Sequence, residues 1–133
     1  MAFTPHETEY FRSQLLGRLA TVALDGQPDN AAVGFRLEDD GSILIGGMNV
    51  TGTRKWRNIE AGNDKVAFVV DDLLSTKPWR PRGVRIYGRA ELVETEGQFG
   101  PGKYLRVVPE VSWSWGIEPD GERFRRRRTT HGA

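Results

Sequence analysis

The chain has 133 residues, which suits one domain, and its formal net charge is only +1, which argues against strong attraction to nucleic acid. It contains no cysteine, which excludes disulfides, thiolate metal sites and cysteine nucleophiles, and we expect no metal site. No run is apolar enough to span a membrane and residues 1–9 lack a signal-peptide core, so we expect a cytoplasmic protein with no membrane or nucleic-acid partner.

The first predicted element is a short amphipathic helix over residues 4–17. Thr4 and Glu7 have the spacing of a capping box, and Tyr10, Phe11 and Leu15 recur at helical spacing. The apolar pattern then changes to period two, which is typical of strands, with Asp-Gly turn signals between the segments. We therefore predict three consecutive antiparallel strands over residues 18–24, 31–37 and 43–46.

A second helix is predicted over residues 53–62, and the apolar run 66–70 then predicts a strand buried on both faces. Two prolines in residues 75–83 rule out a central strand there and predict a loop. Alternation over residues 84–92 and 105–117 predicts two further strands. In the second of these, the period-two pattern places Trp113 and Trp115 on one face, buried in the core or in a dimer interface.

The predicted order is helix, three strands, helix and three strands, without the βαβ rhythm of a parallel sheet. A mainly β (α+β) fold, a six-stranded antiparallel β-barrel with two short helices, fits this order and leaves few unprotected sheet edges. We expect this domain to cover residues 1–118. Residues 119–133 are polar and rich in arginine, and we expect them to form a disordered, solvated tail.

The junction that opens the second predicted helix has the composition of an anion site. Thr53 stands at the start of the helix, and the cations Arg54, Lys55 and Arg57 follow within one turn. Cations at a helix N-terminus oppose the helix dipole, so they cost stability unless an anion offsets them. Backbone N–H groups at the same place favour a phosphate group. A solvated basic face is the alternative interpretation of the same residues.

Several segments of the chain, taken in order and spacing, resemble one known family. They are residues 17–22, 33–36, 45–47, 53–58, 69–72, 78–83 and 114–116. The match resembles the pyridoxamine 5'-phosphate oxidase-like split β-barrel proteins, and within them the F420-dependent (flavin/deazaflavin oxidoreductase B) branch, which uses the deazaflavin coenzyme F420. The subgroup that includes the dehydrotetracycline reductases is the most similar. The resemblance implies an FMN-binding split-barrel fold.

The resemblance also implies which residues hold the coenzyme. Its phosphate would be bound by Thr53, Arg54, Lys55 and Asn58, whereas Arg57 is a weaker candidate that points outward. The ring system would pass the strand that carries residues 19–22. Val33 and Gly34 lie on the neighbouring strand, and Gly34, like Gly46 and Gly47, allows close approach of a ligand.

Family members bind the ring between two subunits, so the resemblance implies a homodimer with two interface sites. The partner subunit would contribute the loop after the first proline, in which Trp79 and Arg82 are the candidates, and Trp115 is a third.

The implied function is an oxidoreductase that transfers hydride from reduced coenzyme F420 to an unsaturated or quinone-like small molecule. No catalytic residue is assigned, because Tyr87, Asp72 or solvent are equal candidates for the proton source. His6 and His131 lie at the two ends of the chain and are given no role. Two alternatives stay open: an FMN-binding oxidoreductase of the same fold, and a noncatalytic protein that binds or sequesters a flavin or deazaflavin.

Overall fold

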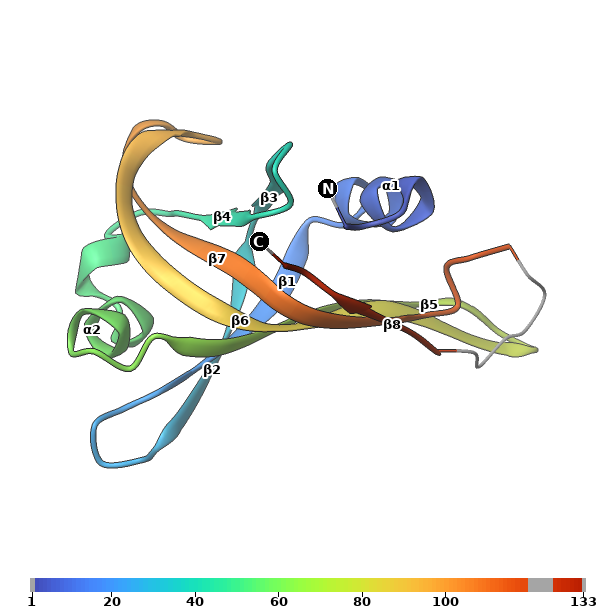
Figure 1. Ribbon diagram of the computed structural model, residues 1–133, viewed down its shortest axis with the longest axis horizontal. Helices are drawn as coiled ribbons and strands as arrows, with labels where there is room; N and C mark the ends of the chain where they lie inside the picture. Colours follow the sequence, from blue (N-terminus) through green and yellow to red (C-terminus); the bar gives the residue numbers. More distant parts are fainter. Residues whose placement is uncertain (1, 120–125, 133) are drawn as a thin grey trace.

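The computed structural model describes residues 2–119 and 126–132, and its helices and strands are shown in Figure 1. No helix among these residues is long and apolar enough to cross a membrane. In chain order, the elements are α1 (Pro5–Ser13), β1 (Leu16–Val22), β2 (Pro28–Gly34), β3 (Arg36–Leu37), β4 (Ile43–Ile45), a short 3-10 helix η1 (Val50–Gly52), α2 (Arg54–Glu60), β5 (Lys65–Thr76), β6 (Trp79–Gly97), β7 (Gly100–Trp115) and β8 (Arg126–Thr130).

The strands form one strongly curved antiparallel sheet in the order β2-β1-β5-β6-β7-β4-β3, with β8 paired to β7. The first and last strands of this order do not pair with each other, so hydrogen bonds leave the barrel open, as in a split barrel. The expected mainly β fold with two short helices is therefore confirmed. The described residues form eight strands rather than six, because the predicted strand 31–37 is divided into β2 and β3 and because the tail adds β8.

The division between β2 and β3 occurs at Phe35, where the chain crosses from one end of the strand order to the other. The Phe35 ring packs edge-on against Phe11 of α1, at 6.2 Å between ring centroids, and against Phe68 of β5, at 5.3 Å. Both of these partners are fully or almost fully buried. Phe11 and Phe68 are buried and Phe35 is partly buried, so this bend makes a large apolar contribution to the core.

Helix α1 is shorter than predicted, although its start is confirmed. Thr4 accepts a hydrogen bond from the Glu7 backbone N–H and the Glu7 carboxylate accepts one from the Thr4 N–H, which completes the capping box. The helix ends at Ser13 because the next residues are already extended, and Leu15, expected on the apolar helix face, is 85% exposed.

The single alternation expected over residues 105–117 is interrupted after Pro109. Trp113 and Trp115 share a face, as expected, but that face is not the core; their burial in a dimer interface stays a prediction. Gly88 of β6 pairs with Pro109 and Tyr87 pairs with Val111, so one residue of β7 has no partner and a β-bulge interrupts the register. A bulge moves all later side chains to the other face of the sheet. Ser112 and Ser114 are consequently buried, whereas Trp113 and Trp115 lie half-buried on the outer face.

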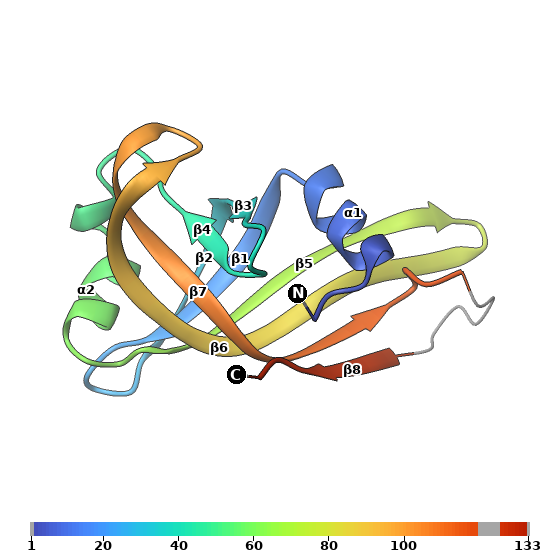
Figure 2. The same cartoon turned by 45° about the horizontal axis from the view of Figure 1, so that its top comes forward.

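The predicted loop over residues 75–83 is instead the end of a β-hairpin. β5 and β6 extend beyond the rest of the sheet as a two-stranded arm, which projects from the body in Figure 2. Pro81 pairs with Leu73 of β5, but β7 pairs with β6 only from Gly83 onward. Pro81 is thus in an edge position, where its missing N–H costs no ladder hydrogen bond. The prolines exclude a central strand here, as predicted, but they allow an edge strand.

The expectation of a disordered tail was wrong for Arg126–Thr130, which forms strand β8. Arg127 donates a hydrogen bond at 3.0 Å to the Glu7 carboxylate of α1, whose side chain is fully buried. The His131 ring contacts Ser112 of β7 at 2.8 Å and packs on Phe3. These contacts with the helix and the sheet outweigh the polar composition of the segment. Residues 120–125 of the predicted tail lie outside the described residues.

Candidate functional site

The predicted anion junction is formed by η1 and the start of α2. The Thr53 side chain caps α2: its hydroxyl accepts from the Trp56 backbone N–H at 3.3 Å and donates to the Val50 carbonyl at 2.6 Å. The N–H groups of Arg54 and Lys55 belong to the first turn, where no intrahelical acceptor exists. Thr53 therefore organises the junction, and the two following amides are directed out of the helix start.

The three cations of the junction have no ion-pair partner among the described residues. Arg54 and Arg57 are exposed and Lys55 is half-buried. Other arginines do form ion pairs: Arg18 lies 3.1 Å from Asp71, and Arg89 lies 2.8 Å from Asp64. Unpaired positive charge at a helix start is unfavourable by itself, so this arrangement fits a phosphate group. The outward direction expected for Arg57 agrees with its exposure.

Asn58 has a structural contact in this arrangement. Its side chain is buried, and its amide donates a hydrogen bond at 2.9 Å to the Thr21 hydroxyl of β1. Asn63, just after α2, donates to the Val22 carbonyl at 3.0 Å. Both bonds tie α2 to the final residues of β1. The anion junction is consequently held against one particular end of this strand.

A groove of about 460 Å³ lies on the outer face of the sheet at the same end of β1. Its floor is formed by small side chains, Ala20 of β1 and its register partner Ala67 of β5. Ala67 and Val69 are only half-buried, which corrects the expectation that this strand is buried on both faces. A groove of this volume falls within the range of small-molecule sites. The complete lining is Ala20, Thr21, Val22, Pro28, Lys65, Val66, Ala67, Tyr87, Gly88, Glu110 and Val111.

The strand expected to pass the ring system therefore does border a cavity. Ala20, Thr21 and Val22 line the groove, whereas Leu19 and Val33 are buried in the core. The sequence reasoning did not identify the other walls of the groove. The wall formed by β6 could have been predicted from the sequence, because the alternation of this strand places Tyr87 on the outer face.

Of the three glycines expected to allow close approach, only Gly46 and Gly47 lie next to the junction. Gly47 has a φ of 151°, a value that favours glycine, and an added side chain there would meet nothing within 4 Å. A Cβ on Gly46 would instead collide with the Tyr104 ring at 2.4 Å, so this glycine has a packing role. Gly34 pairs with Leu16 at the opposite end of β1, about 20 Å from Val22 at the rise of a strand.

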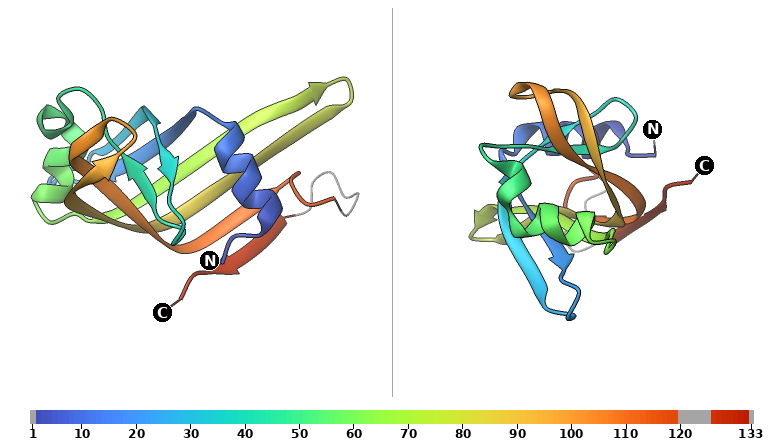
Figure 3. Two further views of the ribbon diagram at one scale, coloured as in Figure 1. Left: turned by 90° about the horizontal axis from the view of Figure 1, so that it is seen from above. Right: turned by 90° about the vertical axis from the view of Figure 1, so that its left-hand side faces the viewer.

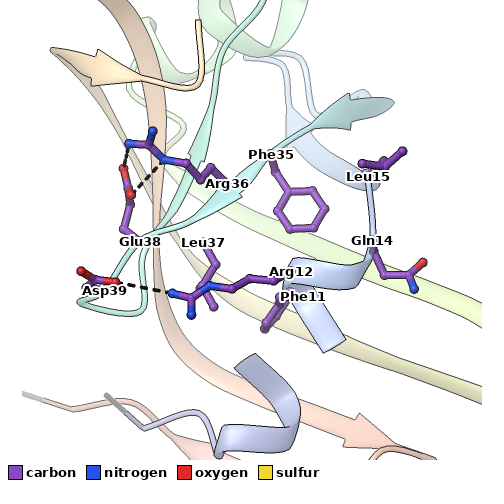
Figure 4. Close-up of a pocket in the computed structure, with 9 residues that line it drawn as sticks. All are labelled: Phe11, Arg12, Gln14, Leu15, Phe35, Arg36, Leu37, Glu38 and Asp39. Carbon is purple, nitrogen blue, oxygen red and sulfur yellow. Dashed lines mark hydrogen bonds and ion pairs between the residues drawn. The ribbon is translucent and has the colours of Figure 1, made fainter. Parts of the chain in front are cut away.

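A second cavity, of about 500 Å³, lies beside Gly34 between the end of α1 and β3 (Figure 4). Its apolar interior includes Phe11, Phe35 and Leu37. The cations at its rim are neutralised: Arg12 pairs with Asp39 at 3.4 Å, and Arg36 binds Glu38 through two hydrogen bonds. This cavity offers no unpaired cation for a phosphate, so it fits the coenzyme phosphate less well than the junction does.

Arg82, expected to contact the coenzyme, is bonded within its own chain. Its guanidinium donates to both oxygens of Asp72, at 2.8 and 3.0 Å, and lies over the Tyr10 ring. These hydrogen bonds from Arg82 hold the pKa of Asp72 below its usual value, despite partial burial of the carboxylate. Burial and the Asp72 carboxylate, which accepts from the Tyr10 hydroxyl at 2.9 Å, raise the pKa of Tyr10. Asp72 is therefore ionised at neutral pH and holds no proton to donate.

Within one subunit, the arm and the junction are far apart. Figure 3 shows the β5–β6 arm and α2 at opposite ends of the molecule, as does Figure 1. Trp79, on the arm, is 54% exposed. Trp115 of β7 pairs with Gly83 at the base of the arm. The fold thus brings Thr53, Arg54, Lys55, Arg57, Asn58 and Gly47 together, and it separates them from Gly34, Trp79, Arg82 and Trp115 in the same chain.

Comparisons with known proteins agree with this fold. A family model described as "Pyridoxamine 5'-phosphate oxidase" matches residues 3–124. The chain is 41% identical over 125 residues to a 5a,11a-dehydrotetracycline/5a,11a-dehydrooxytetracycline reductase of Streptomyces rimosus. This alignment covers 90% of this chain and 87% of the relative. Among solved structures, a conserved hypothetical protein, Rv2991, of Mycobacterium tuberculosis aligns with a TM-score of 0.69 and 24% identity over 87% of this chain and 86% of the other. A FAD binding protein of Mycobacterium smegmatis aligns with a TM-score of 0.62 and 20% identity over 97% and 98%.

Proposed function

The chain belongs to the pyridoxamine 5'-phosphate oxidase family, and we propose that it is an oxidoreductase that uses reduced coenzyme F420 to reduce an unsaturated or quinone-like small molecule. The observation that carries this proposal is the cationic start of α2, which has no ion pair among the described residues and is tied to the end of a groove floored by small side chains. The similarity to a dehydrotetracycline reductase supports a conjugated polycyclic ketone as the class of acceptor.

The chain's own residues would bind and orient the coenzyme. Arg54 and Lys55 would bind its phosphate together with the backbone amides of the first helical turn. Thr53 would stabilise this turn as its N-cap. The ring would lie on the Ala20 and Ala67 floor. When bound, a reduced deazaflavin supplies the hydride. The protein then contributes orientation and exclusion of water, and it needs no nucleophile.

We propose that water supplies the proton that completes the reduction. Asp72 is held ionised by Arg82, and Tyr10 retains its proton in a hydrogen bond to the same carboxylate. Tyr87 lines the groove, but its side chain is 45% exposed, so water has access to the same place. A proton from solvent therefore requires no dedicated acid.

We also propose that the active form is a homodimer. The groove is open on the outer face of the sheet, and the half-buried Trp113 and Trp115 lie on that face. A second subunit laid across it would cover the groove and would bring its own arm, with Trp79, toward the junction. Because the arm is distant within one chain, the partner is the simplest source of the arm residues.

The test measures the oxidation of reduced coenzyme F420 by the purified protein in the absence of oxygen. The absorbance of the oxidised coenzyme, which returns as the reaction proceeds, gives the rate. A panel of conjugated enones and quinones, including dehydrotetracyclines, would serve as acceptors. Oxidation above background with at least one acceptor supports the proposal. Oxidation with none of them would favour a noncatalytic binding protein. A flavin spectrum retained through purification would favour FMN, which carries the same ribityl phosphate.

A further inference from the structure

Arg85 packs against two neighbouring aromatic rings on the outer face of the sheet. Its guanidinium carbon is 4.5 Å from the centroid of the Trp113 ring and 5.3 Å from that of Tyr87. The two rings meet edge to face, with 4.9 Å between their centroids. Strand register places Arg85 opposite Trp113 on β7 and Val69 on β5. Contact with both rings therefore restricts the direction of the guanidinium.

The charge of Arg85 has no carboxylate partner among the described residues. Its Nε atom is shielded from solvent and makes no hydrogen bond there. Two other arginines of the same face are paired: Arg18 with Asp71, and Arg89 with Asp64 and Glu110. A guanidinium packed against rings and left without an acceptor costs free energy, since a partly desolvated donor is unsatisfied. An anion with two oxygens or a delocalised charge would satisfy it.

The groove begins next to this arginine. Tyr87 follows Arg85 by two residues on the same face of β6, and Tyr87 and Val111 line the groove. A flat ligand on the Ala20 and Ala67 floor that extends over the Tyr87 ring would bring one edge to the Arg85 guanidinium. The only acid in the groove lining, Glu110, faces Arg89 at 3.6 Å. Two cations without an ion-pair partner among the described residues therefore face the groove: Lys65 in its lining and Arg85 at the edge nearest Tyr87.

We propose that Arg85 binds the delocalised oxyanion of a planar conjugated ring held in this groove. The inference rests on the proposed function, which supplies two sources of this chemistry. One is the coenzyme's own ring when it is deprotonated. The other is the acceptor: when hydride forms a C–H bond at the conjugated carbon, the π-electron pair moves to the carbonyl oxygen. The resulting enolate is then protonated by water, while the deazaflavin has lost two electrons.

The experiment uses 4-nitrophenol as a probe and the full chain without coenzyme. Because the phenolate is coloured, absorbance across a pH series measures both its binding and its pKa on the protein. We expect the wild-type protein to lower the pKa of the bound phenol. Arg85→Met, which keeps an apolar side chain on Trp113 but removes the charge, should abolish this shift and weaken phenolate binding at least about tenfold. Arg85→Lys should retain part of the shift.

Arg126→Met is the matched control. Arg126 also lies over a tryptophan, 6.0 Å from the Trp115 ring centroid, but it does not line the groove or border Tyr87. This variant should bind the phenolate as the wild type does. Equal binding by the wild type and Arg85→Met, or a bound phenol with an unchanged pKa, would overturn the inference. A purely structural role of Arg85 would alter the melting temperature without moving the probe's pKa.

Two further measurements show whether the coenzyme or the acceptor supplies the oxyanion. They also distinguish a failure of this inference from a failure of the proposed function. If Arg85→Met weakens binding of coenzyme F420 alone, the coenzyme is the source of the oxyanion. If coenzyme affinity is unchanged and only the acceptor's kcat/KM falls, the acceptor is the source. Absence of turnover with every acceptor, together with an Arg85-dependent shift of the phenol pKa, would contradict the proposed reductase but support the oxyanion site.

Discussion

Lys55 is the residue on which the proposed phosphate site depends most, because it is the half-buried member of the three cations at the start of α2 that have no ion pair among the described residues. Substitution by alanine removes one charge-assisted contact and no contact within the core. Lys55→Ala should therefore weaken coenzyme binding by about 1–3 kcal/mol while leaving the fold intact. Titration of the protein with coenzyme measures this change.

Lys103→Ala is a suitable control for that substitution. Lys103 is an exposed cation on β7, and its removal changes the net charge by the same amount without touching the junction. Its coenzyme affinity should match that of the wild type. An unchanged affinity in Lys55→Ala would exclude the phosphate assignment, and an equal loss in both variants would indicate general electrostatic attraction instead.

His131, a residue given no role by sequence reasoning, links the C-terminal strand to the core. Burial is the main cause that lowers the pKa of His131. The positive charge of Arg127 lowers this pKa further, whereas the nearby Glu7 carboxylate raises it. A pKa below the unfolded value of about 6.5 means that the folded protein keeps the ring neutral while the unfolded chain binds a proton. Stability from His131 is thus complete above about pH 6.5 and is lost as the pH falls through the lower folded value.

The measurement is the free energy of unfolding in urea at a series of pH values. The wild type should lose stability in the mildly acidic range, and His131→Gln, which keeps a polar side chain near Ser112, should lose less over that range. Parallel pH profiles for the two proteins would show that another group is responsible. His6→Gln removes the other histidine, whose ring lies 3.4 Å from Glu118, and so separates the effect of that pair from the effect of His131.

At the level of the elements, the bulge in β7 decides which face carries the tryptophans. It requires glycine at position 88, because a Cβ there would lie 2.2 Å from the Val108 carbonyl oxygen, and a backbone atom cannot move away cheaply. Gly88→Ala should lower the free energy of unfolding by about 1–3 kcal/mol, the scale of overpacking. Thermal and urea unfolding measure this loss.

Gly102→Ala, in the same strand pair, is the matched substitution. A Cβ at this position meets nothing within 4 Å, so the change in stability should be small. Equal stability of the Gly88 and Gly102 variants would show that the bulge tolerates a side chain. The groove should also be affected by Gly88→Ala, because Gly88 belongs to its lining.

At the level of the whole molecule, the separation of the junction from the arm makes the proposed dimer testable. Lys55→Ala removes a residue of the junction and Trp79→Ala one of the arm, and each should impair a homodimer at both sites. If the sites are shared, a mixed dimer of the two variants contains one intact site and one site with both substitutions. Refolding the two variants together should then recover activity.

The amount recovered has an upper limit in this design. Random pairing makes about half of the dimers mixed, and each of these has one intact site, so at most about a quarter of the wild-type activity per subunit is expected. Light scattering would confirm that the mixture is dimeric. No recovery from a dimeric mixture would place both residues in sites built from one chain. A monomer in solution would contradict the proposed homodimer.

Much of the fold was predictable because its signals are local. The capping box of Thr4 and Glu7, the period-two strands and the turn signals each act over a few residues, and the structure contains the corresponding elements. The cationic start of α2 was visible for the same reason, since its cations follow one another within one turn. By contrast, the bulge that precedes Trp113 and excludes the tryptophans from the core was not predictable, because a bulge depends on the partner strand.

The sequence by itself determined the mainly β architecture and the cationic start of α2, because hydrophobic period, caps and charge spacing are properties of neighbouring residues. Only the tertiary structure decided that the arginine-rich tail ends in a strand, that Arg82 is neutralised by Asp72 and that Arg85 meets no carboxylate among the described residues. Those outcomes depend on pairing between segments distant in the chain. Burial and charge compensation arise only when such segments meet.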